Sequence, residues 1–416
     1  MGRDTRSGGI FSPTRCCEVK YAGRMSHLRS SSIRQMLKMA SERDLISFAG
    51  GLPDASLFPT ETLAELSQKI IRDYGRTALQ YAPTEGLPAL REKVAFWLRG
   101  KGLEIQEDQV LITQGSQQGI DLLSKLFLES GVGLLAENPS YLGALQCFRF
   151  FEARLYAAAL DEEGMTLEAL NRAVKRKPRL AYLMPNFQNP TSVYYSLARR
   201  KAVTDILAHR GIFMVEDDPY GELIYEGSCL PPLWQFYEGV DKVYLGTFSK
   251  TIVPGLRIAY LVGNEGLVRQ LALIKQATDL HTNNLGQWIV NSFLEEGLLP
   301  AHIELIRDRY RRKRDIMAQS MARHFPSWIR YRIPQGGMFF WVKAPSMLDP
   351  MELLQACLKR GVSFVLGSDF YLESPSDSSY LRLNFTSVEE DRIETGISVI
   401  GEEMRNLTQG EIRRGQ

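Results

Sequence analysis

The sequence predicts an α/β protein in which a mostly parallel sheet lies between helices and a smaller α+β module follows. Between residues 110 and 265, short apolar runs alternate with amphipathic helical stretches, which is the pattern of repeated βαβ units. The apolar runs are almost uninterrupted, as is typical of strands that are covered on both faces. After residue 263 the pattern changes to long helices, and roughly the last 90 residues alternate strands with helices.

The first expected elements are two helices, one that begins after Thr60 and one that Pro88 opens and Gly100 ends. Seven strands of one sheet are then predicted, at residues 110–113, 133–137, 154–158, 180–185, 213–216, 243–247 and 258–262. Between these strands, we expect Ser116 to cap a helix that runs to residue 129 and Gly211 to end another helix.

The C-terminal part is expected to supply the smaller module. Helices are predicted at residues 267–278, 302–324, 350–360 and 388–404, and strands at 328–333, 337–342, 362–365 and 380–384. We therefore divide the chain into an N-terminal tail and segment over 1–45, a large domain over 46–300 and a small α+β domain over 301–416.

Composition and charge exclude several classes of protein. The 416 residues carry 50 Lys and Arg against 48 Asp and Glu, so a concentrated basic face for nucleic acid is not expected. The five cysteines are scattered and lack the spacing of a disulfide framework or a metal site. No run reaches the roughly 18 apolar residues of a membrane-spanning helix. We therefore expect a cytoplasmic protein that binds no nucleic acid, membrane or metal.

The strongest local signal is the segment 246–250, which ends a predicted apolar strand with Lys250. Burial of an ammonium group is costly, and a desolvated lysine is a poised amine that can form a Schiff base with an aldehyde cofactor. The hydroxyls of Thr247 and Ser249 and the guanidinium of Arg257 are natural phosphate ligands. A surface lysine just beyond a strand would fit the same segment.

Three further segments place polar groups directly after predicted strands. Ser116 and Gln117 lie at the start of a helix, where backbone N–H groups point at an anion. Asn189 precedes a proline that fixes its backbone, and Asp217 ends another strand with Tyr220 three residues further on. Taken singly, these segments also fit an ordinary helix cap, an Asn-Pro turn and a solvated acidic turn.

All four segments fall at the carboxyl ends of predicted parallel strands, which is the edge where open α/β sheets bind ligands. Together they supply an amine, a carboxylate, a phenol, an amide and a phosphate cradle. That is the set of groups that pyridoxal phosphate requires. The residues therefore predict an enzyme that uses this cofactor.

From residue 46 to about 386, the chain resembles the pyridoxal-phosphate-dependent aminotransferases of class I/II, which have the aspartate aminotransferase fold. Besides the four segments above, the matching segments are 47–53, 80–86, 137–141, 336–339 and 381–383. Within the family, the chain is similar to the branch that includes 2-aminoadipate and kynurenine aminotransferases. The resemblance implies a fold-type I enzyme that transfers an amino group from a long-chain or aromatic L-amino acid to a 2-oxo acid, expected to be 2-oxoglutarate.

The resemblance also implies a role for each residue at the cofactor. Lys250 would form the Schiff base and move the proton between the substrate's α-carbon and the cofactor's C4′ atom. Asp217 would pair with the ring nitrogen and keep it protonated. Tyr220 and Asn189 would hydrogen-bond the phenolic oxygen of the ring, and Tyr141 would stack on its face. The phosphate ligands would be Ser116, Gln117, Thr247, Ser249 and Arg257, joined by Tyr81 of the other subunit of a homodimer.

For the substrate, the resemblance implies that Arg382 forms a bidentate pair with the α-carboxylate. Asn189 would also lie at the substrate, and Gly51 would let the N-terminal segment approach it closely. Arg34 matches a position that can reach the substrate side chain, although a solvent-facing helix arginine fits this residue as well. A segment carrying Arg34 could turn inward for an acidic substrate and outward for an apolar one.

Two other interpretations compete with an aminotransferase. A pyridoxal phosphate enzyme of the same fold could catalyse β- or γ-elimination, decarboxylation or carbon–carbon bond formation, because the shared cofactor site does not decide the reaction. A transcription regulator with an aminotransferase-like domain would need a DNA-binding domain of roughly 70 residues. Only about 45 residues precede the resemblance, so we expect an enzyme.

Overall fold

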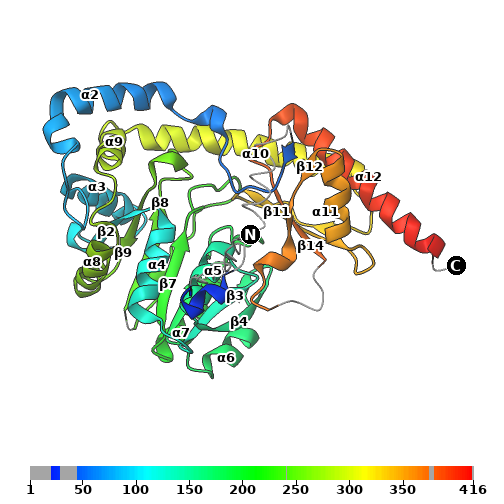
Figure 1. Ribbon diagram of the computed structural model, residues 1–416, viewed down its shortest axis with the longest axis horizontal. Coiled ribbons are helices and arrows are strands. Elements are labelled where there is room, and N and C mark those ends of the chain that lie inside the picture. The colour runs from blue at the N-terminus through cyan, green and yellow to red at the C-terminus, as the bar shows by residue number, and fades with distance from the viewer. Residues whose placement is uncertain (1–19, 29–44, 240, 374–378, 415–416) are drawn as a thin grey trace, which may run out of the picture.

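The computed structural model describes residues 20–28, 45–239, 241–373 and 379–414, and its two main sheets lie beside each other along the longest axis (Figure 1). The larger sheet and its helices lie at one end of the molecule, and the smaller sheet lies toward the C-terminal helix α12 (Glu390–Arg414). The helix α10 (Leu298–His324) runs from the larger sheet toward the smaller one. The positions 46–300 and 301–416 for the two domains stay a prediction.

Within the described residues, the larger sheet has eight strands in the order β2-β9-β8-β7-β6-β3-β4-β5. Their bounds are β2 (Val110–Gln114), β3 (Gly133–Asn138), β4 (Arg154–Asp161), β5 (Gly164–Met165), β6 (Leu180–Leu183), β7 (Phe213–Asp218), β8 (Lys242–Thr247) and β9 (Ile258–Val262). The five strands from β8 to β4 pair in parallel, whereas β9 pairs antiparallel to both β2 and β8. The mostly parallel sheet is confirmed, but seven strands were predicted. The eighth strand, β5, is only two residues long and leaves no hydrophobic pattern.

Helices cover both faces of this sheet, so alternate strand residues enter different cores. Leu134 packs in one core and its neighbour Leu135 in another, on the opposite face. The helices around the larger sheet are α2 (Thr60–Ala78), α3 (Pro88–Arg99), α4 (Ser116–Phe127), α5 (Leu142–Phe150), α6 (Leu167–Val174), α7 (Leu197–His209), α8 (Glu265–Asp279) and α9 (Asn284–Glu295). Burial on both faces explains why the predicted strands lacked polar positions.

The start of α4 differs from the prediction that Ser116 caps it. The N-cap residue is Gly115, which has a φ of 78°, and Ser116 is the first helical residue. Within the described residues, no side chain caps this helix. Ser116 therefore does not act as the cap of α4.

The smaller sheet is antiparallel and has the order β10-β11-β14-β13. The elements of this part are β10 (Arg330–Tyr331), β11 (Phe339–Lys343), α11 (Pro350–Lys359), β12 (Val362–Ser363), β13 (Val365–Leu366) and β14 (Tyr380–Asn384). The strand predicted at 362–365 is split, because β12 pairs with β1 (Ile46–Ser47) and β13 pairs with β14. The segment that follows β1 is thus fixed against the small sheet.

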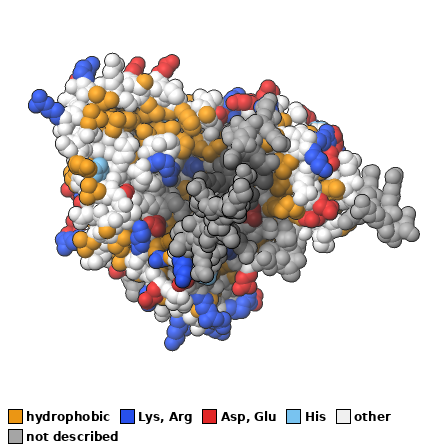
Figure 2. Space-filling model, viewed as in Figure 1, with side chains coloured by type: hydrophobic (Ala, Val, Ile, Leu, Met, Phe, Trp, Pro, Cys, Tyr) orange, Lys and Arg blue, Asp and Glu red, His pale blue; other side chains and the backbone are white. Residues whose placement is uncertain are grey.

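One end of the molecule exposes several large apolar side chains. Ile71 and Tyr74 on α2, and Leu79 and Tyr81 just after it, are between 46% and 77% exposed. Figure 2 shows hydrophobic side chains gathered over this end, where α2 and α9 lie. In the part of the chain that the structure describes, no helix has the length and apolar character needed to cross a lipid bilayer.

Candidate active site

The four predicted segments meet at one edge of the large sheet. The strands β2, β6, β7 and β8 run in the same direction, so their carboxyl ends lie side by side. Lys250 follows β8, Asp217 lies at the end of β7, and Asn189 lies in the segment after β6. The side-chain contacts described below join these segments to β14 and to the segment after β1.

Lys250 is largely enclosed, and its Nζ donates a hydrogen bond to the backbone oxygen of Gly51 over 2.8 Å. Burial, together with the positive charges of Arg257 and Arg382, lowers the pKa of Lys250 to about 8. A lysine with this pKa is partly unprotonated at neutral pH. It can therefore act both as a nucleophile and as a proton carrier.

Asp217 is 2% exposed and has one oxygen in use and one free. Its Oδ2 accepts a hydrogen bond from Tyr182 Oη over 2.5 Å, while Oδ1 has no partner among the described residues. Burial raises the pKa of Asp217 to about 7, although the hydrogen bond from Tyr182 opposes this rise. A buried, unpartnered carboxylate oxygen is costly alone and fits a protonated ring nitrogen.

A chain of hydrogen bonds joins Tyr220, Asn189 and Arg382. Asn189 Nδ2 donates to Tyr220 Oη over 3.3 Å, and Arg382 Nη1 donates to Asn189 Oδ1 over 2.9 Å. Arg382 Nη2 donates to the backbone oxygen of Ala49 over 2.6 Å. The phenol that is predicted to meet the cofactor is thus linked to the guanidinium that is predicted to meet the substrate.

Arg382 keeps donors for a further ligand. It is 1% exposed, and its guanidinium carbon lies 4.3 Å from the ring centroid of Phe339 and 4.9 Å from that of Phe370. Two of its five N–H groups are used as described, and Nε has no partner among the described residues. Burial lowers the pKa of Arg382 to about 10, so the group stays charged at neutral pH. It can still bind a carboxylate through two N–H groups.

Hydroxyl, guanidinium and helix N–H groups converge near Arg257. Arg257 Nη1 donates to Ser249 Oγ over 3.3 Å, and Thr247 Oγ1 donates to the same oxygen over 3.0 Å. Arg257 also lies against Gly115, where a Cβ atom would collide with its guanidinium. This contact brings Arg257 to the start of α4, where Ser116 lies. Such a set of donors is suited to a phosphate group.

Gln117 and Tyr141 border the same region. Gln117 Nε2 donates to the backbone oxygen of Gly143 over 3.0 Å, and Tyr141 lies beside Gly143. Burial raises the pKa of Tyr141. The negative charge of Asp217 adds to this rise, and the positive charges of Arg257 and Arg382 oppose it. Tyr141 therefore lies among the groups predicted to hold the ring, the phosphate and the substrate, as a stacking residue would.

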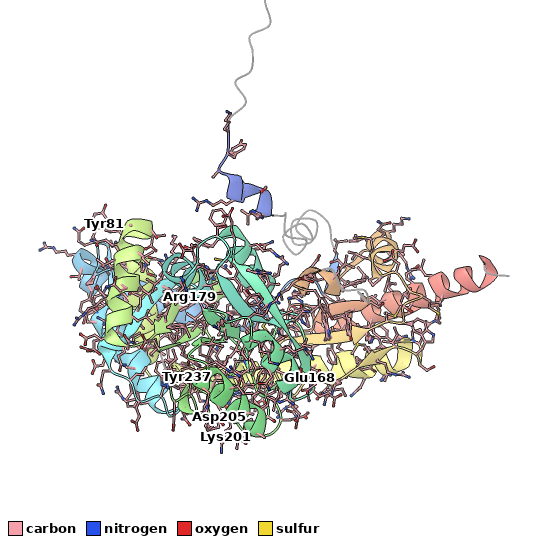
Figure 3. All side chains as sticks on the ribbon, turned by 90° about the horizontal axis from the view of Figure 1, so that it is seen from below. Tyr81, Glu168, Arg179, Lys201, Asp205 and Tyr237 are labelled. Carbon is pink, nitrogen blue, oxygen red and sulfur yellow. The ribbon has the colours of Figure 1, made fainter. Side chains whose placement is uncertain are left out.

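Two predicted residues are not in this cluster. Tyr81 is 77% exposed, packs edge-on against His281 at 5.7 Å between ring centroids, and lies at an outer end of the molecule (Figure 3). Within its own chain it does not contact this cluster, and its role at another subunit stays a prediction. Arg34 lies outside the described residues.

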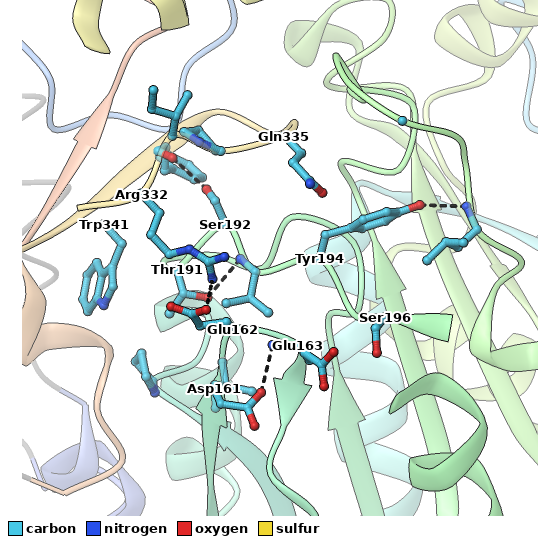
Figure 4. Close-up of a pocket in the computed structure, with 18 of the residues that line it drawn as sticks. Asp161, Glu162, Glu163, Thr191, Ser192, Tyr194, Ser196, Arg332, Gln335 and Trp341 are labelled. Atoms are coloured by element: carbon cyan, nitrogen blue, oxygen red, sulfur yellow. Dashed lines mark hydrogen bonds and ion pairs between the residues drawn. The ribbon is translucent and has the colours of Figure 1, made fainter. Parts of the chain in front are cut away.

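A cavity of about 920 Å³ lies beside the cluster rather than on it. Acidic residues 161–163 line it from the larger sheet, and Arg332 and Trp341 line it from the smaller one (Figure 4). Of the predicted site residues that the structure describes, none lines this cavity. An ion pair of 3.4 Å between Arg332 and Glu162 spans it.

Tyr182 and Phe339 contact the site but were not predicted to. Tyr182 lies in β6, where its neighbours are apolar, so it looked like an ordinary core aromatic. The signal in the sequence was its hydroxyl group, because a buried tyrosine hydroxyl normally has a hydrogen-bond partner. Phe339 lies in a segment that matches the family, but only the structure shows its ring against Arg382.

The family model described as Aminotransferase class I and II matches residues 44–400. The chain belongs to this family. It is 40% identical over 394 residues to the 2-aminoadipate transaminase of Thermus thermophilus, with 93% of this chain and 96% of the relative covered. It is 34% identical to the aromatic-amino-acid aminotransferase 1 of Thermococcus litoralis, with 95% and 96% covered.

Solved structures of aminotransferases have the same fold. Kynurenine aminotransferase of Pyrococcus horikoshii, solved with PMP, is 38% identical, has a TM-score of 0.88, and covers 93% of this chain and 97% of its own. Aspartate aminotransferase of Thermus thermophilus is 21% identical with a TM-score of 0.83, over 92% and 100% of the two chains, which shows the shared fold. This aminotransferase uses pyridoxal phosphate, and the unpartnered Asp217 oxygen and the Arg257 cradle fit that cofactor.

Proposed function

We propose that this aminotransferase takes the amino group from an amino acid with a long or aromatic side chain and gives it to 2-oxoglutarate. The observation that carries the proposal is Arg382, whose remaining N–H donors lie in the same charge cluster as the Lys250 amine. A guanidinium there can bind the α-carboxylate that every donor and acceptor shares. The names of the relatives, a 2-aminoadipate and an aromatic-amino-acid enzyme, support long and aromatic donors.

The residues around Lys250 would divide the work as follows. When bound, pyridoxal phosphate supplies an aldehyde for the amino group and a ring that accepts electrons from the α-carbon. Lys250 Nζ would hold the cofactor and later take the proton from the substrate's α-carbon. Asp217 Oδ1 would hold the proton on the ring nitrogen, and Tyr220 and Asn189 would orient the phenolic oxygen. Tyr141 would cover one face of the ring.

The phosphate would bind where the hydroxyls, the Arg257 guanidinium and the start of α4 converge. Its ligands in this chain would be Ser116, Gln117, Thr247, Ser249 and Arg257. Gly51 would face the substrate through its backbone, since its carbonyl oxygen already meets Lys250 Nζ. The second carboxylate of 2-oxoglutarate would pair with Arg34.

The working unit would be a cytoplasmic homodimer in which each site borrows Tyr81 from the other subunit. The exposure of Tyr81 supports this proposal, because a buried tyrosine could not reach a second chain. The apolar residues beside it, Ile71, Tyr74 and Leu79, would lose their exposed surface in such a dimer.

The test is a pair of half-reactions with the purified holoenzyme. Amino acids, including 2-aminoadipate, kynurenine, phenylalanine and leucine, are added singly, and absorbance follows conversion to the aminated cofactor. Oxo acids are then added to the aminated enzyme, and the amino acid formed is identified. We expect long and aromatic donors to react and 2-oxoglutarate to yield glutamate. The Lys250→Ala protein is the control and should be inactive with all of them. A holoenzyme that reacts only with short donors, or not with 2-oxoglutarate, contradicts the proposal.

A further inference from the structure

Two consecutive aspartates at the end of β7 have similar surroundings but differ in whether both of their carboxylate oxygens have hydrogen-bond partners. Asp217 and Asp218 point to opposite faces of the sheet, as neighbours on a strand do. Each accepts a hydrogen bond from a buried tyrosine on an adjacent strand. Tyr182 on β6 donates to Asp217 over 2.5 Å, and Tyr244 on β8 donates to Asp218 over 2.6 Å.

Only the first of these carboxylates has a vacant oxygen. Asp218 Oδ1 accepts from the backbone N–H of Gly221 over 2.8 Å, so both of its oxygens have partners. Asp217 Oδ1 is buried and has no partner among the described residues. The Tyr182 hydroxyl occupies the other oxygen and therefore decides which one remains for a ligand.

We propose that Tyr182 is a positioning residue that turns Asp217 Oδ1 toward the ring nitrogen of pyridoxal phosphate. The inference rests on the proposed pairing of Asp217 with that nitrogen. It adds that the pairing depends on a residue that does not itself touch the cofactor.

The surroundings of Tyr182 hold its hydroxyl in place. Its side chain is 1% exposed, and its ring meets Phe148 edge-on with 5.4 Å between centroids. Backbone pairing of Tyr182 with Val215 places it on the same face of the sheet as Asp217, two residues further along β7. The phenol therefore cannot swing away without disturbing the core, so it fixes the carboxylate in one rotation.

The hydrogen bond also favours the charged form of the carboxylate. A donor to a carboxylate stabilises the anion, whereas a buried carboxyl with no donor takes up a proton. Without the Tyr182 hydroxyl, Asp217 would be free to rotate and to become neutral. Either change would weaken its bond to a protonated ring nitrogen and leave the phosphate ligands untouched.

The test compares two cofactor forms that differ only at the ring position that Asp217 meets. Pyridoxamine phosphate and its 1-deaza analogue, which has carbon in place of the ring nitrogen, are titrated into the apoenzyme by calorimetry. Neither forms a covalent bond with Lys250. The ratio of their dissociation constants measures the contact with the nitrogen alone. Tyr182→Phe should lower the preference for pyridoxamine phosphate by about tenfold, the loss expected for a charged hydrogen bond.

The matched control is Tyr244→Phe, which removes the same hydroxyl from the same type of pair on the other face. It should leave the ratio unchanged, whatever its effect on stability. In an Asp217→Asn background, adding Tyr182→Phe should not change the ratio further, and this comparison still applies if Tyr182→Phe alone does not fold.

Three outcomes overturn the inference. An unchanged ratio in Tyr182→Phe shows that Asp217 keeps its orientation without the hydroxyl. An equal fall in Tyr244→Phe shows a general effect of removing a buried hydroxyl. A further fall in the Asp217→Asn background shows that Tyr182 acts by another route. If instead the wild-type enzyme has no preference for pyridoxamine phosphate, the proposed pairing of Asp217 itself fails.

Discussion

Lys250 must be reactive as a free amine, and burial of its side chain in that form lowers the stability of the folded protein. Burial and two neighbouring guanidinium groups lower its pKa to about 8, from 10.5 in an unperturbed lysine. Between these pH values the unfolded chain binds the proton and the folded apoenzyme largely does not. The free energy of unfolding of the apoenzyme should therefore rise as the pH rises through this window.

Relative to Lys250→Met, wild-type apoenzyme should gain about 2 kcal/mol of stability when the pH is raised from about 7.5 to 9.5. Urea denaturation of both proteins at the two pH values measures the difference. Parallel behaviour of the two proteins would show that the Lys250 pKa is not lowered.

Arg382→Lys keeps a positive charge but loses the planar arrangement of N–H donors. It should therefore raise KM for donor and acceptor alike by roughly 10- to 150-fold, which corresponds to a loss of about 1.5–3 kcal/mol of binding free energy. Steady-state kinetics with both substrates measures this change. A primary amine that lacks the carboxylate is the matched probe, and its slow reaction should be unaffected. A selective effect on one substrate would contradict a shared carboxylate site.

The site residues differ in how well their sequence context revealed them. Lys250 and Asp217 were found because a charged group at the end of an apolar strand needs an explanation. The ligand role predicted for Ser116 stays a prediction, but its predicted role as a cap was wrong because Gly115 takes the N-cap position. Tyr182 was missed, since one sequence does not show which buried phenol faces which carboxylate.

At the scale of elements, the turn between β2 and α4 brings Gly115 against Arg257. The φ of Gly115 is 78°, which side chains disfavour, and a Cβ atom would also displace the guanidinium. Gly131 is a useful comparison because its φ of 82° is similar, but no described atom lies within 4 Å of a Cβ built there.

Alanine at these two positions separates backbone strain from loss of the cradle. Both Gly115→Ala and Gly131→Ala should lose about 1–3 kcal/mol of stability, as expected for a side chain at a positive φ. Only Gly115→Ala should also bind pyridoxamine phosphate at least about tenfold more weakly, because it moves a phosphate ligand. Thermal denaturation and fluorescence titration measure the two effects. Equal cofactor affinities in both variants would exclude Arg257 from the phosphate site.

Strands that are buried on both faces were predicted well, because their apolar runs are hard to mistake. The short strands were not predicted correctly. The two residues of β5 and the division of 362–365 into β12 and β13 depend on which neighbour each backbone group meets. Such pairing is a tertiary property that hydrophobic periodicity does not contain.

At the scale of the whole molecule, two ion pairs connect distant segments in unequal settings. Lys313 on α10 donates to Asp54 over 2.6 Å, and both side chains are almost fully buried. Lys313 also donates to the backbone oxygen of Thr386 over 3.0 Å, which ties the segment after β1 to the region after β14. Arg332 and Glu162 join the two sheets across the cavity but are 64% and 73% exposed.

Burial should decide what each pair contributes to stability. Lys313→Met removes the 2.6 Å partner of the buried Asp54 carboxylate and leaves it only the longer ion pair of 3.7 Å with Arg309. It should therefore cost up to about 3–5 kcal/mol. Arg332→Ala should cost less than about 1 kcal/mol, because water screens the exposed pair. Chemical denaturation of the two variants checks both values. Similar losses would show that the cavity-spanning pair is stronger than its exposure suggests.

The proposed sharing of sites between subunits predicts recovery of activity in mixtures. Tyr81→Phe and Lys250→Ala proteins should each be impaired. In a mixed dimer, the site with an intact Lys250 borrows an intact Tyr81 and is free of both changes. Activity assays after verified subunit exchange test this expectation. No recovery would place Tyr81 outside the partner's site.

Residues 49 and 51, in the described segment after β1, meet the reactive groups through their backbone oxygens. Arg382 binds the carbonyl oxygen of Ala49, and Lys250 binds that of Gly51. These contacts do not depend on which side chains the segment carries, so long as its path is kept. Evolution is therefore free to change those side chains and, with them, the choice of substrate, while the chemistry stays intact. In this way, one set of catalytic residues can serve related enzymes that act on different substrates.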